Sequence, residues 1–226
     1  MQTTFRALSA LLSYPTPELV AALPEIRTII AADRRLPRRE SAALDALCTT
    51  LAAADPFDAQ ERYVDTFDRG RATSLNLFEH VHGDSRDRGT AMLDLKGVYE
   101  RAGYAFVGNE LPDYVPAVLE FLGTQPLAAA EELLGECAHI LRRIGEALAE
   151  RDSPYAAVFA ALLAAVGADG LVPRKPGRES PRPEKSIDEE WAEEPVIFGP
   201  GAAPSCGAAG PASSVIQFLP RPAAPL

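Results

Sequence analysis

Residues 126–150 read PLAAAEELLGECAHILRRIGEALAE, and this stretch decides the fold class. Its apolar side chains recur every three or four residues, the spacing that places them on one face of an α-helix. The apolar stripe consists of Leu127, Ala130, Leu134, Cys137, Leu141, Ile144 and Leu148. The pattern predicts a single amphipathic helix over residues 126–150, with its apolar face packed against other helices.

The same helical spacing recurs before and after this stretch, between breaks marked by Pro, Gly or Asp. Further helices are expected over about residues 5–12, 16–30, 38–53, 57–68, 85–102, 111–122 and 154–167. We expect Thr16 and Ser85 to cap the helices they precede, and Gly70 to end a helix in the left-handed conformation. The period-two alternation of strands is absent from residues 1–170. We therefore predict an all-α, single-domain helical bundle over residues 1–170.

The charge of the chain is acidic and unevenly distributed. The 226 residues include 22 Lys+Arg and 32 Asp+Glu, a formal net charge of −10. The first 170 residues hold 16 of the basic and 25 of the acidic residues. This balance argues against binding to nucleic acid or to anionic membranes, because both require clustered Lys and Arg. It favours basic partners instead.

The length of the apolar runs and the spacing of the cysteines indicate the cellular compartment of the protein. No apolar run reaches the roughly 18 residues of a membrane span, so we expect no direct membrane insertion. The N-terminus lacks the basic start and apolar stretch of a signal peptide. The chain has three cysteines, far apart and without a C-x-x-C pair, which argues against disulfides and thiolate metal sites. We expect a cytoplasmic protein.

Residues 171–226 differ in composition from the rest of the chain. They contain 11 of the 20 prolines and little material for a core, so we predict a proline-rich, largely disordered tail. Residues 187–198 are an exception, because they hold the single tryptophan, Trp191, followed by a short apolar run. An exposed Trp would be wasteful in a disordered tail, so this segment is expected to dock on the helical part.

The densest polar stretch, residues 79–88, admits three interpretations. Glu79, His80, His82 and Asp84 could form a metal site and make the chain a metal-dependent all-α enzyme. Two histidines at positions i and i+2 share a face on a strand but point apart on a helix, which weakens that interpretation. The side chains could instead anchor an irregular connection by hydrogen bonds, or form a recognition surface. Phosphate loops, nucleophile elbows and H-E-x-x-H motifs are absent from the sequence.

Charged residues alternate in sign beside this stretch. Asp68, Arg69 and Arg71 precede it, and Asp87 and Arg88 close it. These residues would form either separate surface ion pairs of small energy or a network that joins two connections. In both cases we expect them to belong to the scaffold.

Residues 63–89 read YVDTFDRGRATSLNLFEHVHGDSRDRG, the longest motif of the chain. With this motif the sequence closely resembles the nitrate reductase molybdenum cofactor assembly chaperones of the NarJ type, which are related to the TorD/DmsD maturation chaperones. The shorter matches are LLSYP at 11–15, DPFDAQ at 55–60, ELPDYVP at 110–116, LEFL at 119–122, and scattered positions around Trp191. One position departs from the pattern: the family usually has His where this chain has Tyr114, a residue that carries no charge near pH 7.

The resemblance implies a non-catalytic chaperone that holds no cofactor stably. Such a protein would bind the N-terminal segment of the apo catalytic (alpha) subunit of nitrate reductase, a basic amphipathic helix. It would assist insertion of the molybdenum bis-guanine-dinucleotide cofactor before the enzyme attaches to the membrane. A bundle of helices suits this task, since a groove between helices can receive an amphipathic helix.

The expected client-binding face combines the resemblance with polar density. Asp113 and Tyr114 match the peptide site of the wider group. The other candidates rest on their position in polar or aromatic clusters: Tyr14, Phe78, Glu79, His80, His82, Asp84, Arg86 and Glu120.

Overall fold

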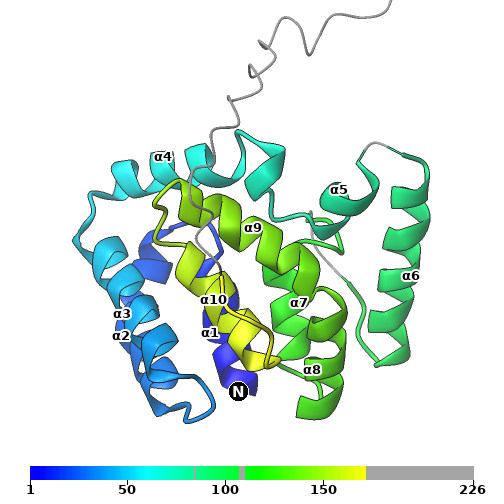
Figure 1. The fold of residues 1–226 in the computed structure, drawn as a ribbon, viewed down its shortest axis with the longest axis horizontal. Helices are drawn as coiled ribbons and strands as arrows, with labels where there is room; N and C mark the ends of the chain where they lie inside the picture. The colour runs from blue at the N-terminus through cyan, green and yellow to red at the C-terminus, as the bar shows by residue number, and fades with distance from the viewer. Residues whose placement is uncertain (84, 107–109, 172–226) are drawn as a thin grey trace, which may run out of the picture. The chain divides into compact units, whose positions relative to one another are not determined.

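The computed structural model describes residues 1–83, 85–106 and 110–171, so the predicted tail and its segment 187–198 lie outside the described part, apart from Leu171. Within these ranges the chain is all-α, as predicted (Figure 1). The helices are α1 (Gln2–Leu11), α2 (Pro17–Ala32), α3 (Arg38–Ala53), α4 (Pro56–Phe67), the 3-10 turn η1 (Arg71–Thr73), α5 (Leu77–His82), α6 (Asp87–Arg101), α7 (Val115–Leu122), α8 (Leu127–Glu136), α9 (Ala138–Glu150) and α10 (Ala156–Ala165).

Helix α10 forms the centre of the bundle. Its sequence, AAVFAALLAA, is apolar on all sides, which is the pattern of a helix covered by other helices. It packs against α9 and α3, and Figure 1 shows it between them. Gly145 permits the close approach of α9, because a Cβ at that position would lie 2.8 Å from the Cβ of Phe159. A larger residue at position 145 would push the two helices apart.

Helix α1 joins α7 to this centre. Phe5, Leu8 and Leu11 are fully buried, and burial of each such side chain contributes about 1.5–3 kcal/mol. The hydroxyl of Ser9, also buried, donates a hydrogen bond to the carbonyl of Pro116 over 2.7 Å. Since Pro116 lies in the first turn of α7, this bond fixes the start of α7 against α1.

The helix starts follow two capping signals in the sequence. The hydroxyl of Thr16 accepts the backbone N–H of Leu19 at 3.3 Å, as expected. The carboxylate of Asp55 accepts the N–H of Phe57 at 2.9 Å, with Pro56 as the first helical residue. Both caps satisfy N–H groups that have no partner inside the helix.

The prediction of one helix over residues 126–150 was wrong. Two helices, α8 and α9, meet at Cys137, and the N–H of Cys137 is directed to the carbonyl of Gly135 instead of continuing the α-helical ladder. Gly135 has low helix propensity, which makes a break beside it cheap. The break lets the two halves cover different partners: α9 packs on α10, whereas Leu133 of α8 lies beside Val98 and Val118.

Three further details around residues 68–86 correct the sequence analysis. Gly70 is extended, with φ −179°, and α4 ends at Asp68 without a left-handed residue. Ser85 does not cap a helix, since α6 begins at Asp87 after Arg86 with no side-chain cap. The short helix α5 was not predicted. Its six residues span less than two turns, too few for a periodic pattern, and contacts from elsewhere in the chain hold it.

Candidate functional site

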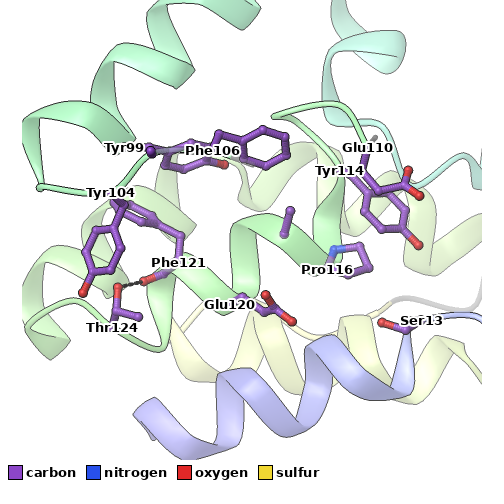
Figure 2. Close-up of a pocket in the computed structure, with 12 residues that line it drawn as sticks. Ser13, Tyr99, Tyr104, Phe106, Glu110, Tyr114, Pro116, Glu120, Phe121 and Thr124 are labelled. Atoms are coloured by element: carbon purple, nitrogen blue, oxygen red, sulfur yellow. Dashed lines mark hydrogen bonds between the residues drawn. The ribbon is translucent and has the colours of Figure 1, made fainter. Parts of the chain in front are cut away.

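A groove runs along α7 between the end of α1 and the segment that follows α6. We call it the α7 groove, and its volume is about 400 Å³ (Figure 2). Its lining comprises Ser13, Tyr99, Tyr104, Ala105, Phe106, Glu110, Tyr114, Pro116, Ala117, Glu120, Phe121 and Thr124. The groove therefore combines Ser13 with residues of the stretch 99–124.

Aromatic rings form the apolar wall of the α7 groove. The rings of Tyr99 and Phe106 stack with centroids 5.9 Å apart, and Phe121 lies 4.6 Å from Tyr99 and 5.9 Å from Tyr104. The Tyr99 hydroxyl donates to the carbonyl of Pro112 at 2.7 Å, and burial raises the pKa of Tyr99, so the ring is neutral and fixed. Rigid aromatic walls of this kind receive apolar side chains at little entropic cost.

Tyr114, at the other end of the groove, is linked to Tyr63, which in turn contacts Tyr14. The Tyr63 hydroxyl donates to the carbonyl of Leu12 at 2.8 Å, so the Tyr114 hydroxyl, 3.1 Å away, is the donor of the bond between the two tyrosines. The Tyr14 ring, 44% exposed, meets Tyr63 edge to face at 5.5 Å. Burial raises the pKa of both Tyr63 and Tyr114, which keeps them uncharged near neutral pH.

The charge of the groove is negative. Glu110 and Glu120 line it and are exposed, and among the described residues its lining includes no Lys or Arg. Figure 2 shows Glu110 beside Tyr114 and Glu120 in the space toward α1. Among the ion pairs of the described residues, none involves either carboxylate. An apolar groove with two carboxylates fits a segment that carries both apolar and basic side chains.

Asp113 lies beneath the groove and holds α5. It has no exposed surface, its carbonyl accepts the N–H of Leu77 at 3.1 Å, and its carboxylate accepts the N–H of Phe78 at 2.9 Å. Asp113 thus caps α5 from a segment 35 residues away. Burial raises the pKa of Asp113, and the Phe78 hydrogen bond and the nearby Arg88 oppose that shift.

The polar side chains of α5 are used within the protein. The Glu79 carboxylate accepts the Ser74 hydroxyl at 2.6 Å, the His80 ring nitrogen Nε2 lies 2.8 Å from the Ser74 carbonyl, and Arg71 pairs with Glu79 at 3.7 Å. The Arg71 pair joins η1 to α5, whereas Arg69 pairs with Asp65 of the preceding helix α4. His80 therefore belongs to a hydrogen-bonded connection, which was one of the three interpretations.

Gly83 follows α5 where the chain passes close to Arg71. Its φ is +54°, and a Cβ there would lie 2.6 Å from the Arg71 guanidinium. Only glycine suits this combination of conformation and space. Within residues 1–83, 85–106 and 110–171, no group of three His, Cys, Asp or Glu side chains could hold a metal ion. Asp84, a member of the suggested metal site, lies outside the described residues.

The predicted client-binding residues separate into distinct places. Tyr114 and Glu120 line the α7 groove, and Tyr14 lies at its edge. Phe78 lines a different hollow, with Leu95 and Val118. His82 packs on Phe78 at 5.9 Å between ring centroids, and Arg86 is exposed just before α6. The nine candidates within the described residues lie in different places and do not form one surface.

The sequence analysis missed most of the aromatic wall. Tyr99, Tyr104 and Phe106 were not candidates, although they lie close together in sequence around Gly103. An aromatic cluster at the end of a helix is the signal that could have identified them. Glu110 and Phe121 belong to the family motifs but were not assigned to the site.

An all-α bundle with an acidic, aromatic groove defines a helical binding protein. No helix in the described part of the chain combines the length and the apolar character that a membrane span requires. Residues 33–161 match the model of the nitrate reductase delta subunit family.

Named relatives agree with that match. The nitrate reductase molybdenum cofactor assembly chaperone NarJ of Escherichia coli K12 is 41% identical over 195 residues, 84% of this chain and 83% of its own length. The probable assembly chaperone NarW of the same strain is 40% identical over 76% of each chain. The probable NarJ of Bacillus subtilis 168 is 37% identical over 73% of this chain and 89% of its own.

The chain belongs to the nitrate reductase delta subunit family. The NarJ and NarW relatives described above are named assembly chaperones and not catalytic enzymes. The chaperone interpretation is therefore preferred to the metalloenzyme interpretation of Glu79, His80, His82 and Asp84.

Proposed function

We propose that this protein is a chaperone for respiratory nitrate reductase that binds the N-terminal segment of the apo catalytic subunit in its α7 groove. It acts in the cytoplasm, before the enzyme attaches to the membrane. By holding the apo enzyme it permits insertion of the molybdenum bis-guanine-dinucleotide cofactor, which it does not itself hold stably. The names of the relatives support the client and the cofactor.

The observation that carries the peptide site is the chemistry of the α7 groove. Its aromatic wall offers pockets for the apolar face of an amphipathic helix, which supplies most of the affinity. Glu110 and Glu120 lie where basic side chains on the flank of that helix would meet them. Carboxylates favour encounter with a basic segment and disfavour acidic ones.

Tyr114 can contact the client without changing its charge. Its hydroxyl is already paired with Tyr63, and the ring lines the groove beside Glu110. A ring held in this way can stack on an apolar side chain or on a guanidinium of the client. We therefore expect the contact at this position to be independent of pH between about 6 and 8, unlike a contact made by histidine.

Calorimetry with a peptide of about 25 residues from the N-terminus of the catalytic subunit tests the proposal. The peptide is expected to bind at micromolar concentration at low salt. The double variant Glu110→Gln/Glu120→Gln should weaken binding by about 10-fold, because it removes the two groove charges and keeps their shapes.

The matched control is Glu100→Gln/Glu150→Gln, which changes the net charge equally at exposed positions outside the α7 groove. It should leave the affinity within about 2-fold of the original. No detectable binding at tens of micromolar, across pH 6 to 8, would exclude the peptide-binding mechanism.

A further inference from the structure

The chain contains a local cluster of arginines although its net charge is negative. Between α2 and α3 the sequence runs Arg34-Arg35-Leu36-Pro37-Arg38-Arg39, in a protein of net charge −10. All four arginines are exposed, whereas Leu36 between them is buried. Leu36 anchors the loop in the core and leaves the guanidinium groups in solvent.

The start of this loop is fixed by contacts of Asp33. Its carboxylate pairs with the Met1 ammonium at 2.9 Å, and both groups are almost fully buried. The same carboxylate accepts the Thr4 hydroxyl and, at 3.0 Å, the backbone N–H of Arg35. Burial opposes ionisation, but these hydrogen bonds and the ammonium together lower the pKa of Asp33. The Asp33 charge is therefore neutralised by Met1.

A hollow of about 490 Å³ adjoins the loop. Its lining comprises Met1, Thr3, Thr4, Thr28, Ile29, Ala32, Asp33, Arg34 and Arg35. Because Asp33 is neutralised, Arg34 and Arg35 determine the charge that a ligand in the hollow meets. Arg34 has no ion pair within the described residues, and Arg35 uses one nitrogen, Nη1, on Glu131. The Thr3 hydroxyl adds a further donor.

We propose that this hollow binds phosphoryl oxyanions, as phosphate esters or anhydrides. Guanidinium groups present N–H pairs that match two phosphate oxygens, and a hydroxyl can donate to a third. Arg38 and Arg39, in the first turn of α3, increase the positive field at its mouth. The site goes beyond the proposed function, since it is separate from the α7 groove and of opposite charge.

Calorimetric titration with inorganic pyrophosphate at low ionic strength tests the site. Binding is expected for the full chain, with little heat from sulfate at the same ionic strength. Arg34→Gln/Arg35→Gln should weaken it by at least 10-fold, and Arg38→Gln/Arg39→Gln by about 3-fold, because the second pair acts through its field alone. If the first double variant fails to fold, Arg34→Gln alone replaces it, since Arg34 makes no ion pair in the described structure.

The control Arg143→Gln/Arg151→Gln removes the same charge from exposed positions outside the hollow and should change nothing. Sedimentation with phosphatidylglycerol vesicles, compared with phosphatidylcholine vesicles, separates the two sources of phosphate. Arg34-dependent binding to the anionic vesicles without binding of pyrophosphate assigns the site to lipid headgroups. Failure of both ligands to bind, or binding unaffected by the Arg34 and Arg35 substitutions, overturns the proposal.

Discussion

The segment at residues 110–121 and the segment at residues 74–88 are both rich in polar residues from family motifs, yet the structure uses them differently. In the first, Glu110 and Glu120 face an open groove and make no ion pair within the described residues. In the second, Glu79 and His80 both contact Ser74. The first segment therefore presents carboxylates without an ion pair in the described residues, whereas the polar groups of the second segment are bonded within the protein.

This comparison shows that polar density alone does not mark a binding surface. A polar group that already has a protein partner gains little from a new one, because the old bond must be broken first. Asp113 links the two segments, since it precedes Tyr114 of the groove and caps α5. The two segments can therefore be tested separately and through Asp113.

The largest expected effect is on stability, from Asp113→Ala. The substitution leaves the buried N–H of Phe78 without its acceptor and creates space in the core, at a cost of about 3 kcal/mol in the free energy of unfolding. Denaturant unfolding measures the loss, and amide exchange should accelerate first at Leu77 and Phe78. A loss below about 0.5 kcal/mol would show that Asp113 does not hold α5.

The second effect distinguishes the two segments by affinity. Tyr114→Ala should weaken client-peptide binding by about 30-fold, about 2 kcal/mol, because it removes an aromatic contact in the α7 groove. His80→Gln/His82→Gln should change the affinity by less than about 3-fold, because both residues lie outside the groove. Calorimetry measures both. The reverse order of the two losses would place the peptide on α5.

The smallest effect is a gain, from Asp113→Asn. The asparagine oxygen can still accept the Phe78 N–H, and the free-energy cost of burying a charged carboxylate is removed. Since the pKa of Asp113 is raised, its favourable contribution is present below about pH 4 and is lost as the pH rises through the folded-state value. The variant should therefore exceed the original in stability by about 1 kcal/mol at pH 7, and the difference should vanish in acid.

Urea unfolding between pH 3.5 and 7.5 measures this difference. Asp94→Asn, at an exposed position on α6, is the matched control and should show no such dependence on pH. A gain that is equal at all pH values would mean that the pKa of Asp113 does not change on folding.

Most of the helices could be predicted because their apolar residues repeat over three turns or more. Helices α3 and α10 follow the expected segments closely. The break at Cys137 could not be predicted, since the apolar stripe continues through it at unbroken helical spacing. The break depends on which helices α8 and α9 cover, a property of the whole bundle.

The candidate site was predicted in part, for a related reason. Tyr114 came from a matched position of the wider group's peptide site and Glu120 from its polar surroundings, and both line the α7 groove. Tyr99 lies in the apolar stripe of α6, and Tyr104 and Phe106 follow that helix, and none of the three was assigned to a site. Their exposure to a groove depends on α7 and α1 leaving a gap opposite them.

The sequence by itself determined the all-α class, the family and the acidic character of the protein, because helical periodicity, motif order and charge are local or additive properties. Tertiary structure alone decided which polar residues remain available. Glu79 and His80 are hydrogen-bonded within the protein, and Asp113 is buried. The packing of the helices places Tyr99, Glu110 and Glu120 in one groove. Availability depends on neighbours that are distant in the chain, and these neighbours exist only once the helices have packed.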